Sequence, residues 1–309
     1  MLKKTKIALV IAAVLMLSGL ILLAVFEWNT PLVTTTYNID KDFIMVIVNA
    51  DTADVVFRTS DDGTCRVVCS EYENEKHNVF RRDNGLWIAT AQKEQWYEYL
   101  RIRFAKPKIT VYLPQEEYNW LSIDGSTGDV EVAEGISFTN VDIYRTTGDV
   151  SYSASASRSM KMITTTGDIR VENVTTGNLE LSASTGDIML LNVTCTDADI
   201  NVSTGDVTAE NFYCQNLISN GSTGDITLKN AIAGKSFYIT RSTGDVCFDG
   251  SDAEEITVKT DTGDISGTLL SEKHFYTSTG TGSVDIPQTF TGGYCEFTTD
   301  TGDIKIGIQ

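Results

Sequence analysis

Ser203-Thr204-Gly205-Asp206-Val207 is followed, 19 residues later, by Ser222-Thr223-Gly224-Asp225-Ile226, and this recurring segment decides the fold. Its glycine returns at intervals of 19 or 20 residues between residue 128 and the end of the chain. Nine of the ten glycines precede an aspartate, and Ser283 is the exception. Such regular spacing marks an internal repeat. The repeated turn residues are Gly128, Asp129, Gly148, Asp149, Gly167, Asp168, Gly186, Asp187, Gly205, Asp206, Gly224, Asp225, Gly244, Asp245, Gly263, Asp264, Gly282, Gly302 and Asp303.

Apolar and polar residues alternate on both sides of each glycine. Ile188 and Leu190 stand two and four residues after Gly186, and Leu181 and Leu179 stand five and seven residues before it. A period of two predicts strands with one buried face. One unit of this size cannot bury its apolar face alone, whereas coils stacked about 4.8 Å apart form a continuous core. The sequence therefore predicts an all-β, single-stranded β-solenoid, right-handed by analogy with other β-helices.

The Thr-Gly-Asp segment has two interpretations. In the first, glycine supplies a positive φ in a tight turn, and the threonine and aspartate oxygens bind free backbone groups. In the second, a calcium ion relieves the repulsion between stacked carboxylates. Calcium-binding β-rolls have glycine-rich turns and a period of about nine residues, so we favour the structural turn. Asp187, Asp206 and Asp225 stay as weaker calcium candidates, and we expect no other metal and no cofactor.

The segment before the regular repeats is related to them but irregular. Residues 49–55, N-A-D-T-A-D-V, are a degenerate version of the turn. We expect residues 36–125 to form the first coils and the N-terminal cap, and residues 126–309 to form the regular solenoid. Within the first segment, strands are expected at residues 43–48, 66–69, 86–89 and 108–113.

The N-terminus predicts a membrane anchor. Ile7 to Phe26 is a run of 20 uncharged residues preceded by three lysines. This length suits the hydrocarbon layer of a bilayer, and the lysines favour a cytoplasmic N-terminus. We therefore expect a single pass through the bacterial cell membrane, with an extracellular C-terminal domain; the alternative is a cleaved signal peptide. The segments would be a cytoplasmic tail (1–6), a transmembrane signal anchor (7–26) and a linker (27–35).

Charge limits the partners. The chain has a formal net charge of −18, so we expect it to repel nucleic acid. Basic and aromatic residues gather between residues 76 and 108, where they could bind anionic cell-wall polymer, lipid headgroups or glycan. The favoured alternative is a capping hairpin with a solvated charged face, because aromatic side chains are usually buried. The candidate patch residues are Arg81, Arg82, Trp96, Tyr97, Arg101 and Arg103.

Cysteine and histidine positions indicate no active site. Cys195 and Cys214 are 19 residues apart and should lie on neighbouring coils, where the spacing permits a disulfide. They could equally be a short ladder of buried thiols. His77 and His274 are far apart in the sequence, and no nucleophile elbow, P-loop or dinucleotide motif occurs. We therefore expect neither a metal site nor an enzyme.

Three motifs together resemble a known family. They are N-A-D-T-A-D-V at residues 49–55, V-Y-L-P at residues 111–114 and the S-T-G-D-I/V series from Ser126 to Ile304. Over residues 35–309 the chain resembles the bacterial, membrane-anchored "putative-adhesin" domain of unknown function with β-strand repeats. The resemblance implies a β-helical fold and a role in adhesion or in sensing cell-envelope stress. It supplies no catalytic residues, and Ser283 departs from its turn pattern.

The sequence thus predicts a non-enzymatic cell-surface scaffold whose partner is cell-wall polymer, glycan or an envelope protein. The alternative is a protein-interaction or self-assembly module, because Ile304–Ile308 is the last strand of the sequence and would leave an open coil. A glycan-cleaving solenoid enzyme is a third hypothesis. It is disfavoured because the aspartate row is uniform, whereas an active site would interrupt the repeat locally.

Overall fold

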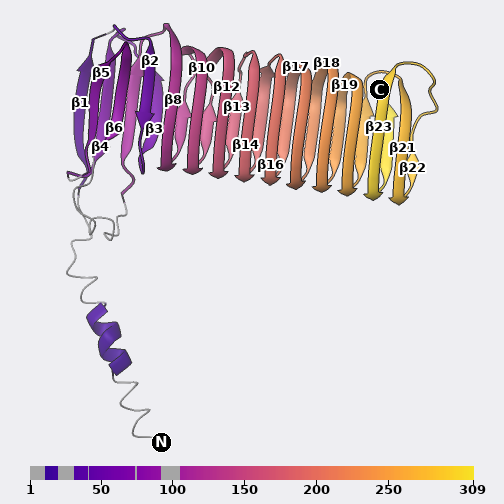
Figure 1. Cartoon of the computed structure of the whole chain (residues 1–309), viewed down its shortest axis with the longest axis horizontal. Helices are drawn as coiled ribbons and strands as arrows, with labels where there is room; N and C mark the ends of the chain where they lie inside the picture. Colours follow the sequence, from indigo (N-terminus) through magenta and orange to yellow (C-terminus); the bar gives the residue numbers. More distant parts are fainter. Residues whose placement is uncertain (1–10, 20–30, 41, 74, 92–104) are drawn as a thin grey trace, which may run out of the picture.

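The computed structural model describes residues 11–19, 31–40, 42–73, 75–91 and 105–309. Strands stacked side by side form a rod (Figure 1), and the predicted β-solenoid is confirmed. The strands form one continuous sheet that wraps around the core, so that each coil contributes to two faces. We call the face whose strands run into the Thr-Gly-Asp turns the forward face, and the face that follows these turns the reverse face.

The forward face is parallel except for the pairing of β5 with β6. Neighbouring strands of the repeat pair at equivalent positions of successive coils, so that Leu181 lies opposite Ile200. In spatial order the strands are β5 (His77–Arg82), β6 (Gly85–Thr90), β2 (Met45–Asn49), β8 (Glu117–Thr127), β10 (Ser137–Thr147), β12 (Ser155–Thr166), β14 (Asn178–Thr185), β16 (Asp197–Thr204), the second parts of β17 (Val207–Thr223), β18 (Ile226–Thr243) and β19 (Val246–Thr262), then β23 (Gly293–Thr301) and β21 (Lys273–Thr281).

The reverse face begins with antiparallel strands and continues in parallel. The antiparallel pairs are β1 with β4 and β4 with β7. In spatial order its strands are β1 (Val33–Ile39), β4 (Cys65–Glu71), β7 (Lys108–Leu113), β3 (Asp54–Thr59), β9 (Val130–Val132), β11 (Val150–Tyr152), β13 (Ile169–Glu172), β15 (Ile188–Thr194), the first parts of β17, β18 and β19, then β20 (Ile265–Leu269), β24 (Ile304–Ile308) and β22 (Val284–Asp285).

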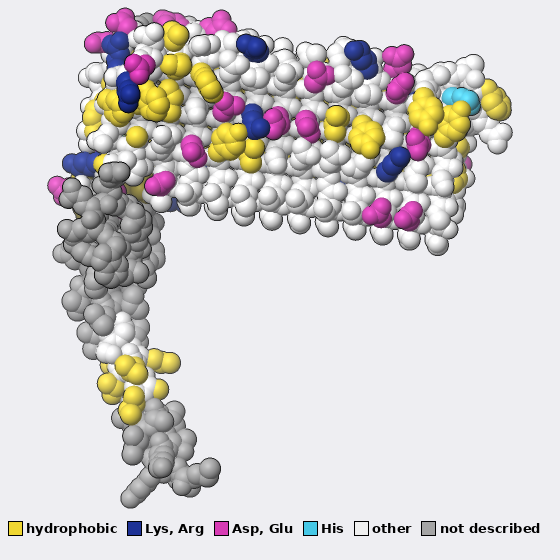
Figure 2. Space-filling view, viewed as in Figure 1, with side chains coloured by type: hydrophobic (Ala, Val, Ile, Leu, Met, Phe, Trp, Pro, Cys, Tyr) yellow, Lys and Arg dark blue, Asp and Glu magenta, His cyan; other side chains and the backbone are white. Residues whose placement is uncertain are grey.

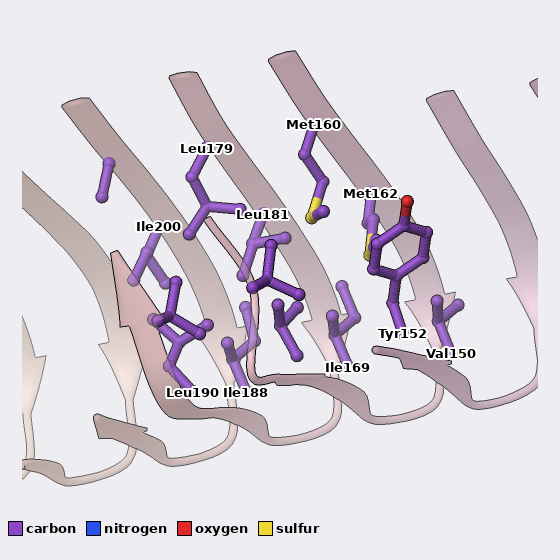
Figure 3. Close-up of a cluster of buried hydrophobic side chains, with 14 of the residues drawn as sticks. Val150, Tyr152, Met160, Met162, Ile169, Leu179, Leu181, Ile188, Leu190 and Ile200 are labelled. Atoms are coloured by element: carbon purple, nitrogen blue, oxygen red, sulfur yellow. The ribbon is translucent and has the colours of Figure 1, made fainter. Parts of the chain in front are cut away.

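Side chains at the positions predicted to point inward form the core. Figure 3 shows Met162 and Leu181 of the forward face directed toward Ile169 and Leu190 of the reverse face. All four are fully buried. Stacking coils repeats this contact along the rod, so one continuous core runs through the described solenoid. The alternation read from the sequence is therefore the pattern that the packing uses.

The turn geometry explains why Gly and Asp recur. Gly205 has a φ of 143°, and a Cβ placed on it would lie 2.1 Å from the carbonyl oxygen of Gly186. Only glycine tolerates both the backbone conformation and the close approach. The backbone N–H of Asp206 donates to Oδ1 of Asp187 at 2.8 Å, so each turn binds the turn before it. The hydrogen-bonded series runs through Asp54, Asp129, Asp149, Asp168, Asp187, Asp206, Asp225, Asp245, Asp264, Asp303 and Ser283.

The last coil of the sequence is not the last coil of the rod. β23 pairs with β19 on one side and with β21 on the other, while β24 lies between β20 and β22. Figure 1 shows β21 and β22 at the far end of the rod, beyond β23. The prediction that Ile304–Ile308 forms an open edge is therefore wrong, because both of its edges are paired.

This insertion explains the exception at Ser283. The Ser283 backbone N–H and side-chain hydroxyl both donate to Oδ1 of Asp303, at 2.7 and 3.0 Å. These bonds lower the pKa of the Asp303 carboxyl group. Since no further turn follows Ser283 in the described stack, a carboxylate at this position would have no backbone N–H from which to accept a hydrogen bond. Serine therefore ends the ladder of turns without an unused charge.

The N-terminal end of the solenoid has its own construction. The four expected strands correspond to β2, β4, β6 and β7, within two residues at each end. Asp54 opens the ladder of turns, so the degenerate motif is the first turn of the stack. The antiparallel strands close this end, and β1 begins at Val33, inside the segment expected as a linker. The division of the chain into five segments stays a prediction.

The ladder of asparagines at the corner opposite the Thr-Gly-Asp turns was not foreseen from the sequence. Asn173, Asn192, Asn211 and Asn230 have φ values of 56°, 55°, 53° and 49°. Asparagine tolerates this left-handed conformation better than most residues do. Each later side-chain amide donates to Oδ1 of the preceding asparagine at 2.8–2.9 Å. The signal in the sequence was an asparagine six residues after four successive turn glycines.

The structure corrects the predicted membrane anchor. In the described part of the chain, no helix is long and apolar enough to cross a membrane. The described helix covers residues 11–19. The predicted single-pass topology, with a cytoplasmic N-terminus and an extracellular C-terminal domain, is therefore not supported. Residues 1–10 and 20–26 of the predicted tail and anchor lie outside the described residues.

Candidate functional site

The predicted basic and aromatic patch is described only in part. Arg81 donates to the backbone oxygen of Asp42 at 2.8 Å and lies 3.7 Å from its carboxylate. Arg82 pairs with Asp83 at 3.1 Å. Both arginines therefore already have acidic neighbours. The other members, Trp96, Tyr97, Arg101 and Arg103, lie outside the described residues, so the patch stays a prediction.

The calcium candidates have one oxygen each in a structural role. Oδ1 of Asp187, Asp206 and Asp225 accepts a backbone N–H of the next turn at 2.8 Å. Among the described residues, no group of three or more acidic, histidine or cysteine side chains converges in a way that could hold a metal ion. The ladder therefore explains these aspartates without an ion, and calcium binding stays a prediction.

Cys195 and Cys214 lie on neighbouring coils, as the spacing predicts. The Cys195 backbone N–H donates to the oxygen of Tyr213, the residue before Cys214, at 2.9 Å. Both are free thiols with 7% of their surface exposed. Burial raises the pKa of Cys195 to about 12 and raises the pKa of Cys214 as well. Since the thiolate is the reactive form, both should be inert in the folded chain, and the disulfide stays a prediction.

We expect only Cys247 to react quickly with Ellman's reagent in the folded protein, because it alone of the six cysteines is not buried. Unfolding without a reductant should then release all six thiols if the buried pair is free, and two fewer if Cys195 and Cys214 are bonded. The variant Cys247→Ser should remove the fast phase and leave the slow one. Rapid labelling of the Cys247→Ser variant would contradict this assignment.

The outward side of the forward face carries three rows of side chains that run along the rod. The corner row is Asn178, Asp197, Asn216 and Ser236; the middle row is Glu180, Asp199, Ile218 and Tyr238; the turn row is Ser182, Asn201, Asn220 and Thr240. The corner and middle rows line a groove of about 470 Å³ that crosses four coils. Figure 2 shows a band of charged and hydrophobic side chains along one face of the rod.

The polar side chains beside this groove hold one another in place. In the corner row, the Asn216 amide donates to Asp197 at 2.7 Å, and the Ser236 hydroxyl donates to Asn216 at 3.1 Å. In the turn row, Thr240 donates to Asn220 at 2.7 Å and Asn220 to Asn201 at 3.3 Å. The Asn201 amide in turn donates to Asp199 at 2.8 Å. Each amide keeps hydrogen-bonding capacity beyond these contacts.

Two apolar side chains interrupt the middle row. Ile218 and Tyr238 lie opposite each other on neighbouring coils, and each has 42% of its surface exposed. Earlier coils carry Asp142, Lys161 and Glu180 at the same position. Solvent favours polar residues there, so this pair departs from the polar pattern of those earlier coils. An apolar residue at an outward position was the sequence signal that could have located the groove.

The groove is acidic. Glu180 pairs with Lys161 at 2.6 Å, and this contact raises the pKa of the lysine. Asp197 and Asp199 have amide partners but no cationic partner among the residues that the structure describes. The groove therefore carries uncompensated negative charge.

Comparison with known families assigns the architecture. A family model described as Toastrack DUF4097 matches residues 45–215 and 203–309. The chain belongs to the Toastrack DUF4097 family. The two Toastrack matches together span nearly the whole described solenoid, in agreement with the resemblance found from the turn motifs. No curated protein matches the chain.

Solved structures share the Toastrack fold. A "putative adhesin" from Parabacteroides merdae ATCC 43184 is 13% identical, with a TM-score of 0.50, and the match covers 90% of this chain and 97% of that one. A "putative lipid binding protein" from Parabacteroides distasonis ATCC 8503 is 16% identical, with a TM-score of 0.50, over 89% and 97% of the two chains. At these identities the likeness shows the fold alone.

Proposed function

We propose that this Toastrack protein is a non-enzymatic binding rod of the adhesin type, which holds its ligand on an extended strand face. The observation that carries the proposal is the groove across four coils, whose polar side chains are fixed by hydrogen bonds and whose middle row exposes Ile218 and Tyr238. Solenoids commonly bind through such extended surfaces. The adhesin name of the structural neighbour from P. merdae agrees with this role.

Co-sedimentation tests the proposal. The purified full chain is mixed with isolated bacterial cell wall and, separately, with anionic liposomes, each with and without calcium. We expect no binding to the liposomes, because the chain has a net charge of −18 and like charges repel. We expect saturable binding to the wall, because its uncharged glycan meets no such repulsion. A soluble protein of similar size and charge serves as the control. If the chain stays in the supernatant with both the wall and the liposomes, whether or not calcium is present, the adhesin-type role is contradicted.

A second candidate function is self-assembly at the end of the rod formed by β21 and β22. The outer edge of β21 has no neighbouring strand among the described residues, and free strand edges pair with other chains. Phe290 is 85% exposed and Val284 is 43% exposed at this end. Light scattering should then show dimers that Phe290→Ser weakens, whereas a strictly monomeric wild-type chain would reject this candidate.

A further inference from the structure

We propose that the forward-face groove binds an uncharged oligosaccharide that lies along the rod axis. The inference rests on the binding-rod function proposed above and names the ligand class of that site. The groove volume of about 470 Å³ falls within the range typical of small-ligand sites. Four coils at about 4.8 Å spacing give a length of roughly 14 Å, enough for a short run of sugar units.

The apolar wall of the groove suits the face of a sugar ring. Ile218 and Tyr238 lie side by side, and each exposes 42% of its surface. The preceding coils carry polar residues at the same position. Sugar rings present C–H groups on their faces, which pack against an aromatic ring or an aliphatic side chain. Such contacts remove apolar surface from water without requiring a charged partner.

The polar wall suits the hydroxyl groups at the edge of the same ring. Asp197, Asn216 and Ser236 form one hydrogen-bonded series, with separations of 2.7 and 3.1 Å. Amides can both donate and accept, which matches neighbouring hydroxyl groups that do the same. Because these side chains are already held by one another, less conformational entropy is lost when a ligand binds.

Charge decides against an anionic ligand. Asp197 and Asp199 have no cationic partner among the described residues, and Lys161, which precedes Glu180 in the middle row, is paired with that glutamate. A uronate or phosphate polymer would meet uncompensated negative charge. A basic peptide would be attracted, but the groove is lined mainly by amide, hydroxyl and apolar groups, and Oδ1 of each aspartate already accepts an amide N–H.

Calorimetric titration of the full chain tests the inference. The probes are hexasaccharides of β-linked glucose, xylose and N-acetylglucosamine, with hexagalacturonate as the anionic probe and hexalysine as the basic peptide. We expect at least one uncharged hexasaccharide to bind and hexagalacturonate not to bind. Tyr238→Ala should weaken binding about tenfold through the loss of the stacked ring, whereas Tyr238→Phe should retain it.

Tyr213→Ala is the matched control. Tyr213 is also a tyrosine with 42% of its surface exposed, but it does not line the groove, so its loss should leave sugar affinity unchanged. Equal thermal melting of the three tyrosine variants would show that folding is intact. The inference is overturned if no uncharged hexasaccharide binds, if Tyr238→Ala binds as the wild type does, or if hexalysine binds more tightly than every sugar and loses affinity in Asp199→Asn.

Failure of this inference and failure of the proposed function are distinguishable. A chain that co-sediments with cell wall but ignores all the uncharged hexasaccharides remains a binding rod with another ligand. A chain that binds neither loses both assignments. If Tyr238→Ala abolishes sugar binding but not wall binding, the groove is a sugar site and the wall contact lies elsewhere on the rod.

Discussion

Gly205→Ala should destabilise the solenoid by about 3 kcal/mol or more, because strained backbone and steric overlap add at this position. Gly205 has a φ of 143°, a conformation that residues with a Cβ rarely adopt. The added methyl group would also lie 2.1 Å from the Gly186 carbonyl oxygen. Relief of that contact requires two coils to move apart, which weakens the hydrogen bond between Asp206 and Asp187.

Urea unfolding followed by circular dichroism measures this effect. Gly307→Ala is the matched control, because its Cβ would meet no atom closer than 3.6 Å. We expect the control to change the free energy of unfolding by less than about 1 kcal/mol, as is usual for substitutions without a steric conflict. Equal unfolding midpoints for the two variants would show that the turn tolerates a Cβ at position 205, contrary to this prediction.

Lys273→Met should loosen the end of the rod by about 3 kcal/mol, because it leaves a carboxylate without its buried cation. Lys273 is 3% exposed, and its ammonium group binds Oδ1 of Asp252 at 2.6 Å. It also donates to the Ala253 oxygen at 2.7 Å and the Ser271 hydroxyl at 2.8 Å. Gly293 of β23 lies beside Lys273 of β21. The Lys273 side chain therefore extends past β23 to its partners in β19, and it links the terminal coil of the rod to β19.

Hydrogen exchange measured by mass spectrometry localises the effect. We expect about a hundredfold faster exchange in β21 and β23, since each 1.4 kcal/mol corresponds to a factor of ten, and no change in β14 or β16. Lys259→Met provides the control, because Lys259 and Glu296 form a partly exposed pair at 3.5 Å, which should contribute little. Identical exchange in β21 for both variants would argue against the inserted order of the coils.

Buried arginines in the solenoid show where pattern reading fails. Arg145 and Arg241 occupy inward positions, and each is 3% exposed. They fit because Gly125 and Gly221 of the preceding coils have no side chain; a Cβ there would lie 1.9 and 2.1 Å from the two guanidinium groups. Burial lowers the pKa of Arg241 to about 10. Alternation alone predicts an apolar residue at these positions.

The candidate groove could be predicted only in part. The period of 19 or 20 residues is enough to place Ile218 beside Tyr238 and Asn216 beside Asp197. Whether these outward side chains leave a hollow depends on their rotamers and on the hydrogen bonds among them, which the spacing does not specify.

The single coil is encoded locally, in about 19 consecutive residues. Alternation assigns the buried face, the glycine permits the turn, and the aspartate binds the adjacent turn. The order of the coils at the end of the rod is instead a property of the tertiary structure, since a strand pattern shows which face is buried but not which strand pairs with it. Ser283 ends the ladder because β23 and β24 are inserted before it, and that order depends on contacts between residues distant in the chain.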